Sequence, residues 1–211
     1  MKNRKLEIIL AAIVALLPMI AGAILYSRLP EQIATHFGMN GEADGWSGRA
    51  FTVFGLPAIM ASLTLFGGFV LSTDPKRQNM NPVLLTIGIW TAPAVSILVS
   101  AFILSNALGY SSRIELIWPV LTGILFIFIG NYLPKTKQSY TMGIRLPWTL
   151  ASEENWNRTH RLAGFLWVIG GILMIILSLL HLWPSWLVIV LITLLALVPA
   201  IYSYSLYKKG I

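Results

Sequence analysis

The sequence predicts an all-α fold, a polytopic membrane helix bundle with six transmembrane helices and both termini in the cytoplasm. Of its 211 residues, 56% are hydrophobic and only 11% are charged, whereas roughly a quarter of the residues in a soluble domain are charged. The charged residues lie almost wholly outside six long apolar runs. The chain has no cysteine, which excludes disulfides and thiolate chemistry.

Each apolar run has about the 18 residues or more that a helix needs to cross a ~30 Å hydrocarbon core. The first run follows a basic start, as in a signal peptide. We nevertheless expect a retained helix, because residues 27–30 (SRLP) form a poor cleavage site. The predicted spans are residues 6–27, 50–71, 83–106, 115–133, 162–181 and 186–207.

The basic residues predict the orientation of the bundle. With the N-terminus inside, twelve of the fifteen lysines and arginines lie on the cytoplasmic side, and only Arg28, Arg49 and Arg113 lie outside. Such an asymmetry is the positive-inside signal. It also accounts for the net charge of +7, so we expect contact with the lipid bilayer and no direct nucleic-acid binding.

The first outer loop, residues 29–49, is expected to be a folded, solvated loop. Pro30 followed by EQIATHF predicts a short surface helix, and Asn40-Gly41 and Asp44-Gly45 predict turns. The loop carries His36 with three acids, without a fixed ligand spacing such as HExxH. We therefore expect no metal and no other cofactor. A membrane metalloenzyme using Glu31, His36, Glu42 and Asp44 is left open.

Prolines and glycines occur within the predicted spans. Pro18, Pro57, Pro93 and Pro199 lie inside them, and the pairs Gly67-Gly68 and Gly170-Gly171 let helices approach closely. Ordinary bundle packing explains these residues. Kinked helices also occur in gates, so a small-solute or peptide transporter or channel stays as an alternative. Against it, no ionisable residue lies near the middle of any span.

The longest polar interval, residues 130–161, is the main candidate site. Ser152 is placed as an N-cap followed by Glu153 and Glu154, and Trp156, His160, Ala163 and Trp167 recur on one face of a helix that enters the fifth span. Arginine and tryptophan dominate binding hot spots, so the interval could contact a protein. Equally, the tryptophans could anchor the interface while the bases bind lipid phosphates.

We find no nucleophile–base–orienter arrangement, so we expect no catalytic residues and no enzyme activity. The residues of a cytoplasmic partner surface or structural motif are then Asn131, Arg145, Pro147, Trp148, Glu154, Trp156, Arg158, His160 and Arg161.

Several segments resemble a known family. GNYLPK, GIRLPWTL and ENWNRTHRLAG resemble the C-terminal half of the SdpI family of bacterial membrane proteins, although many members have threonine in place of Leu146. LPEQIATHFGMNGEADGW resembles the DUF1648 domain that commonly precedes it. The resemblance implies a DUF1648-like region at 1–75 and an SdpI-like region at 76–211, with a cytoplasmic segment at 134–161.

The resemblance also implies a function. Family members are multi-pass proteins of the bacterial plasma membrane, and the best-known member gives immunity to a secreted killing-factor toxin. That member is also a receptor that holds a transcriptional repressor at the membrane. By this similarity, the outer loop would sense a toxin peptide and the cytoplasmic segment would contact a repressor. The implied toxin-sensing residues are Glu31, His36, Glu42, Asp44 and Trp46.

Overall fold

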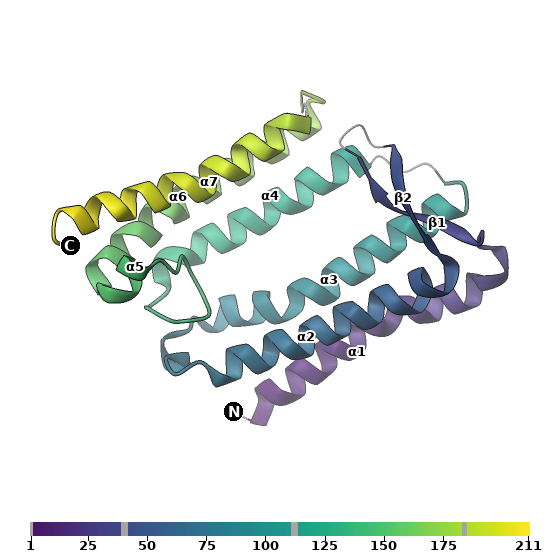
Figure 1. Cartoon of the computed structure of the whole chain (residues 1–211), viewed down its shortest axis with the longest axis horizontal. Helices are drawn as coiled ribbons and strands as arrows, with labels where there is room; N and C mark the ends of the chain where they lie inside the picture. The colour runs from purple at the N-terminus through teal and green to yellow at the C-terminus, as the bar shows by residue number, and fades with distance from the viewer. Residues whose placement is uncertain (1, 39–41, 111–113, 183–184) are drawn as a thin grey trace. The chain divides into compact units, whose positions relative to one another are not determined.

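A computed structural model describes residues 2–38, 42–110, 114–182 and 185–211. Within these residues, six helices are long and apolar enough to cross a membrane, which confirms the predicted fold class (Figure 1). The predicted turn at Asn40-Gly41 lies outside the described residues. The six long helices are α1 (Lys2–Leu25), α2 (Leu56–Thr73), α3 (Pro82–Ala107), α4 (Ile114–Tyr132), α6 (Glu153–Leu179) and α7 (Ser185–Lys208).

Short elements connect the long helices. Two strands, β1 (Gln32–Phe37) and β2 (Ala43–Gly48), form an antiparallel hairpin between α1 and α2. The helix α5 (Pro147–Ala151) precedes α6. The remaining elements are the 3₁₀ turns η1 (Tyr26–Arg28), η3 (Arg77–Asn79) and η4 (Leu133–Lys135), and the π-helical turn η2 (Phe51–Gly55).

The long helices expose large apolar side chains and bury small or polar groups, as helices in lipid do. On α7, for example, Leu194, Leu197 and Ile201 share one face and are 50%, 51% and 65% exposed. Small or polar groups face the neighbouring helices instead, among them Ser203 on α7 and Gly170 on α6. Because lipid tails are as apolar as leucine, close contact between small residues holds such helices together.

The chain divides into two compact units, an N-terminal unit of Met1–Val70 and Thr86–Ile114 and a C-terminal unit of Leu71–Leu85 and Glu115–Ile211. In the N-terminal unit, Ala15 of α1 is fully buried and its carbonyl accepts a hydrogen bond from the Ser96 hydroxyl of α3, at 2.8 Å. Gly68 of α2 lies against the Ile8 side chain, whereas its neighbour Gly67 faces open space. Only one member of this predicted glycine pair therefore serves a close contact.

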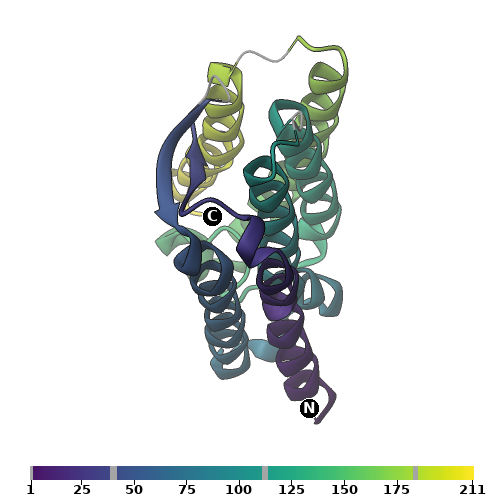
Figure 2. The ribbon, with the colours of Figure 1, turned by 90° about the vertical axis from the view of Figure 1, so that its right-hand side faces the viewer.

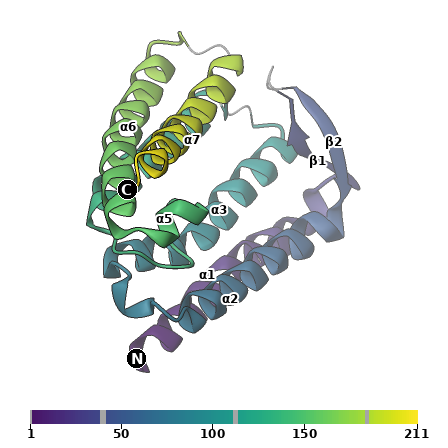
Figure 3. The ribbon, with the colours of Figure 1, turned by 60° about the vertical axis from the view of Figure 1, so that its left-hand side comes forward.

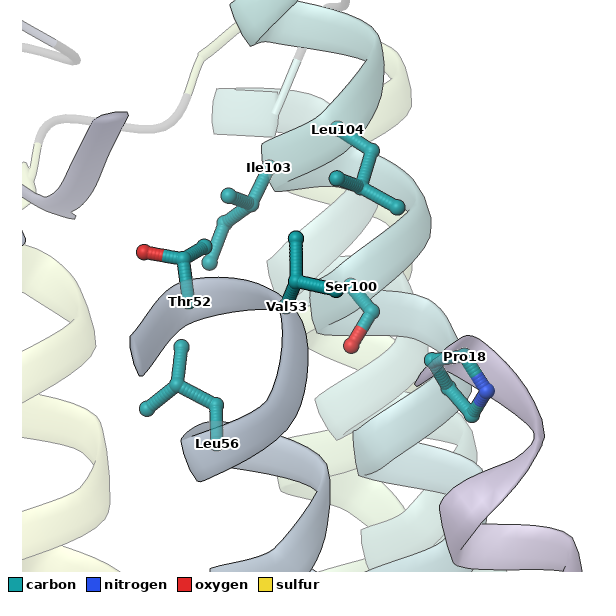
Figure 4. Close-up of a pocket in the computed structure, with 7 residues that line it drawn as sticks. All are labelled: Pro18, Thr52, Val53, Leu56, Ser100, Ile103 and Leu104. Atoms are coloured by element: carbon teal, nitrogen blue, oxygen red, sulfur yellow. The ribbon is translucent and has the colours of Figure 1, made fainter. Parts of the chain in front are cut away.

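The second helix starts with an irregular turn. The π-helical turn η2 runs directly into α2, and Pro57 follows it as the second residue of α2, inside one helical stretch from Phe51 to Thr73. Next to this turn a cavity of about 10 Å³ is lined by groups from three helices, and Figure 4 shows Pro18 on α1, Thr52 on η2 and Ser100 on α3 around it. A cavity of this size holds about one water molecule and is too small for a solute.

The outer loop corrects the sequence-based prediction. The EQIATHF segment is a strand instead of a surface helix, and Asp44-Gly45 lies within β2 instead of forming a turn. Ile33 and Phe37 have a spacing that suits either structure, and pairing with residues 43–48 decides in favour of the strand. Figure 2 shows that α1 runs from the N-terminus to the end of the N-terminal unit where this hairpin lies.

In the C-terminal unit, α4 and α6 approach each other at two pairs of glycines. A Cβ atom on Gly171 would lie 2.4 Å from the Gly123 carbonyl oxygen, and one on Gly164 would lie 2.6 Å from the Gly130 carbonyl oxygen. The two pairs place the helices antiparallel. Figure 3 shows α6 and α7 side by side, with α5 and the C-terminus at one end. That end carries the polar interval singled out by the sequence.

Candidate functional site

The hairpin of β1 and β2, named the outer hairpin after its predicted side of the membrane, is anchored to the rest of the N-terminal unit by buried residues. The side chain of Ile33 is 1% exposed and belongs to a cluster with Leu29 and Ile103. At the base of the hairpin, the Arg49 guanidinium donates hydrogen bonds to the carbonyls of Tyr26 and Leu29, at 3.1 and 3.0 Å, and lies over the Tyr26 ring. These contacts fix the hairpin without using its exposed side chains.

The exposed side chains of the hairpin include three that the sequence predicts as toxin-sensing. Trp46 is 60% exposed and pairs across the hairpin with Ala34, so its ring lies open beside a small residue. His36 Nδ1 contacts Asp44 Oδ1, and both side chains are exposed. Irregularities in the register surround His36, and such bulges redirect side chains.

The four residues considered for a metal do not gather. Glu31 lies at the base of the hairpin, where its carbonyl accepts from the Arg49 N–H, and Glu42 lies toward the tip, where its carbonyl accepts from the Gly38 N–H. Among the described residues, no three His, Cys, Asp or Glu side chains come close enough to share an ion. The hairpin thus offers His36 and Asp44 as a pair.

In the segment at 134–161, named the cytoplasmic segment after its predicted side of the membrane, Trp156 and His160 form a buried core. Both side chains are 0% exposed, and their rings stack with centroids 4.0 Å apart. Trp156 Nε1 donates to the Thr136 carbonyl at 2.7 Å. His160 Nε2 accepts from the Ile144 N–H at 2.9 Å, so the proton of the neutral ring lies on Nδ1, which donates to the Trp156 carbonyl. Both residues therefore hold the segment in place and are unavailable to a partner.

Gly143 permits the close approach of the loop to this core. Its φ is +100°, and a Cβ atom there would lie 2.5 Å from His160 Nε2 and 2.8 Å from the Trp156 ring. The chain then becomes extended at Leu146, as the following proline requires, and Pro147 starts α5. The Thr149 hydroxyl accepts from the Leu146 N–H at 2.8 Å. The GIRLPWTL segment is thus a tight turn leading into a short helix.

The start of α6 confirms the predicted N-cap. The Ser152 hydroxyl accepts from the Asn155 N–H at 3.2 Å, and Glu153 and Glu154 occupy the first helical turn. Asn155 itself is 0% exposed, and its amide nitrogen donates to the Ser203 carbonyl at 3.0 Å. This bond ties α6 to α7 at the end that carries the polar segment.

Asp74, which the sequence analysis passed over, organises the segment from the preceding loop. Its carboxylate is buried and accepts from the Lys76 N–H, the Tyr140 N–H and the Thr141 hydroxyl, at 2.6, 3.0 and 2.5 Å. Burial raises the pKa of Asp74, but these hydrogen bonds outweigh burial and hold the pKa below its ordinary value of 3.8.

Gln138 completes the link between the two loops. Its side-chain amide nitrogen donates to the carbonyls of Thr149 and Leu150, at 2.9 and 2.7 Å, and its side-chain oxygen accepts from Lys76 Nζ at 2.5 Å. The Gln138 main-chain carbonyl also accepts from the Asn79 side chain at 2.9 Å. The loop with Asp74 and the segment before α5 are therefore one hydrogen-bonded body.

The other predicted residues of the segment lie at its surface. Arg145 is exposed and donates to the Tyr140 carbonyl at 2.9 Å, and Arg158 pairs with Glu154 at 2.5 Å. Trp148 is half-buried against Tyr204 and Tyr207, and its indole nitrogen has no hydrogen-bond partner among the described residues. The remaining exposed residues of the predicted set are Asn131, Pro147 and Arg161.

Sequence reasoning missed Asp74, Gln138 and Arg49 as organising residues. A weak signal was present for Asp74, since it is an acid on the side where the bases concentrate. For Gln138 and Arg49 the sequence carries no such signal, because their partners are main-chain carbonyls that only the fold brings into reach.

Comparison with known proteins identifies the family. Residues 135–203 match the SdpI/YfhL protein family, and residues 13–61 match DUF1648, a domain of unknown function. The immunity protein SdpI of Bacillus subtilis (strain 168) is 31% identical over 202 residues, covering 95% of this chain and 96% of that protein. No solved structure matches the chain. The chain, a multi-pass bacterial membrane protein, therefore belongs to the SdpI family.

Proposed function

We propose that this protein is a membrane immunity protein that protects the bacterium against a secreted killing-factor toxin. The observation that carries the proposal is the relation to an immunity protein along 95% of the chain. Protection by this route needs binding and no bond-breaking chemistry, so we assign no catalytic residue and no cofactor.

The toxin would contact the outer hairpin. An exposed tryptophan next to an exposed histidine–aspartate contact combines an apolar anchor with polar groups that select a partner, and tryptophan is a frequent hot-spot residue. Trp46, His36 and Asp44 provide this combination on a hairpin that is anchored by other residues. Losing one of the three should therefore weaken toxin binding without unfolding the loop.

The test is survival of a toxin-sensitive bacterium that lacks its own immunity gene. Cells that express the chain should tolerate a killing-factor peptide, and Trp46→Ala should lower the tolerated dose on the order of tenfold, as expected for a binding hot spot. Trp186→Ala is the matched control, since Trp186 is 61% exposed and lies at the end of α7 predicted to face outward. Equal death of cells with and without the chain, at confirmed membrane insertion, would contradict the proposal.

On the inner side, we propose that the exposed rim of the cytoplasmic segment captures a repressor protein. Arg145 and Pro147 are exposed, and Arg145 donates to the main-chain carbonyl of Tyr140, whose side chain is 48% exposed, whereas Trp156 and His160 are buried. An exposed arginine near an aromatic ring fits the composition of a binding patch.

Charge reversal tests this second role. Arg145→Glu should abolish recruitment of the repressor to membranes, measured by co-sedimentation, while membrane insertion stays unchanged. Lys209→Glu is the control, because Lys209 is also an exposed base on the side predicted to be cytoplasmic. Equal recruitment by wild type and Arg145→Glu would show that the rim does not bind the repressor, and it would leave the immunity proposal unaffected.

A further inference from the structure

Two helices of the C-terminal unit change from apolar to polar exposed residues at the same level. On α6, the exposed residues Phe165, Ile169 and Ile172 continue toward the N-terminus of the helix as Arg161 and Arg158, at spacings of three and four. On α4, the exposed residue Phe128 is followed by the exposed residue Asn131.

The glycine contact between the helices shows that these two changes coincide. Gly130 of α4 lies against Gly164 of α6, and each glycine sits between the apolar and the polar residue of its own helix. The ring of Phe128 and the ring of Phe165 thus mark the hydrocarbon side, while Asn131 and Arg161 mark the headgroup side.

Lys135 lies on the stretch of chain that packs along α6 at this boundary. Pro134 packs on Gly164, and the Thr136 carbonyl accepts from Trp156 Nε1, so the chain from Pro134 to Thr136 runs along α6 past the position of Arg161. Lys135 lies between those two contacts, and its ammonium is 4.9 Å from the centre of the Tyr132 ring. Two exposed bases therefore flank the contact between η4 and α6.

Neither base has an acidic partner among the described residues. Nearby on α6, Glu154 pairs with Arg158. An exposed arginine at headgroup depth can reach the phosphates of the bilayer, which are the anions at that level. The exposed Phe165 continues this surface toward the hydrocarbon, which favours a lipid over a soluble protein as the partner.

We propose that Arg161 and Lys135 form a binding site for the phosphate of an anionic phospholipid, with the acyl chains along Phe165 and Phe128. The site holds one lipid against the junction of α4, η4 and α6. The guanidinium of Arg161 donates to the phosphate oxygens, and the ammonium of Lys135 contributes the second charge. The inference does not depend on toxin or repressor binding.

The test measures lipids retained by the purified full chain. The protein is reconstituted in nanodiscs of equal parts phosphatidylglycerol and phosphatidylcholine, extracted into detergent and examined by native mass spectrometry. Arg161→Gln should lower retained phosphatidylglycerol about fivefold, the effect of one base near an anionic surface. Arg161→Lys should retain most of it, and Arg161→Gln with Lys135→Gln should lose more than either single change.

Arg28→Gln is the matched control, because Arg28 is an exposed arginine of the N-terminal unit at the opposite predicted side of the membrane. It should leave lipid retention unchanged. Retention of phosphatidylglycerol by the double variant at the wild-type level would overturn the proposal, and so would an equal loss in Arg28→Gln. Unchanged lipid retention together with lost repressor recruitment in the double variant would assign the two bases to a protein surface instead. An unchanged unfolding temperature of Arg161→Gln shows that the lipid effect is not a loss of fold.

Discussion

The outer hairpin and the cytoplasmic segment both concentrate polar and aromatic residues, but they hold them in opposite ways. In the hairpin, Trp46 is 60% exposed and the anchor is the apolar residue Ile33 on the opposite side. In the cytoplasmic segment, Trp156 is 0% exposed and itself forms the anchor, stacked on His160.

This difference in burial decides which of the conspicuous aromatic residues can bind a partner. A tryptophan in a polar stretch is equally conspicuous in both places, yet one is open to a ligand and the other supports a loop. In the cytoplasmic segment, recognition is left to the exposed neighbours of the anchor, such as Arg145. Substitutions should accordingly affect folding in the segment and recognition in the hairpin.

The largest expected effect is that of Gly143→Ala. The left-handed backbone costs a non-glycine residue about 1–2 kcal/mol, and a Cβ atom 2.5 Å from His160 Nε2 adds overpacking of about 1–3 kcal/mol. We expect a loss of about 4 kcal/mol in the free energy of unfolding, measured by denaturant titration in detergent. Gly109→Ala, at φ +85° with no atom within 4 Å, is the control and should lose only the backbone part. Equal losses would show that the contact with His160 is unimportant.

Gly164→Ala should be the next in size. Its Cβ atom would lie 2.6 Å from both the Gly130 carbonyl oxygen and the Pro134 ring, which separates α6 from α4 and displaces η4. Overpacking of this kind destabilises by about 2–3 kcal/mol. Gly67→Ala, which meets no atom within 4 Å, should instead be neutral or stabilising by up to about 1 kcal/mol. If Gly67→Ala destabilised the protein as much as Gly164→Ala, the loss in Gly164→Ala would not be due to its contact with Gly130 and Pro134.

Asp74→Asn should destabilise the protein by about 2 kcal/mol. Both carboxylate oxygens accept hydrogen bonds, and the asparagine side chain replaces one of them with an NH₂ group, which would face a donor instead. The wild type should also respond to pH. A carboxyl group with a lowered folded pKa stabilises fully above its ordinary value of 3.8, and this contribution disappears as the pH falls through the folded value.

The measurement is the difference in the free energy of unfolding between pH 7 and a pH below 4. This difference should be smaller in Asp74→Asn than in the wild type. An exposed carboxyl, Glu153→Gln, is the control. If the variant keeps the full acid response, other groups are responsible for it.

The smallest effect on folding is expected in the hairpin. His36→Ala should change the free energy of unfolding by less than about 0.5 kcal/mol, since exposed ion pairs contribute little. The same variant should lower toxin tolerance if the hairpin is the contact. A large folding defect in His36→Ala would mean that the hairpin, like the cytoplasmic segment, uses its polar residues as structure.

Parts of the site were accessible from sequence because they depend on local chemistry. The N-cap at Ser152 and the shared helical face of Trp156 and His160 follow from capping and from the 3.6-residue period. The hairpin was predicted wrongly, as a helix, because a seven-residue segment with Ile33 and Phe37 fits both periods. The choice depends on pairing with the strand at residues 43–48, which a pattern within residues 31–37 does not contain.

The sequence by itself determined that six apolar helices cross the membrane, because the length of each span follows from the thickness of the hydrocarbon core. It also determined the family. Only the tertiary structure decided which residues of the polar segment are buried, because burial depends on what packs against a side chain. Asp74 shows this most clearly. Two of its three donors, at Tyr140 and Thr141, are more than 60 residues away, and only the folded loops bring them to the buried carboxylate.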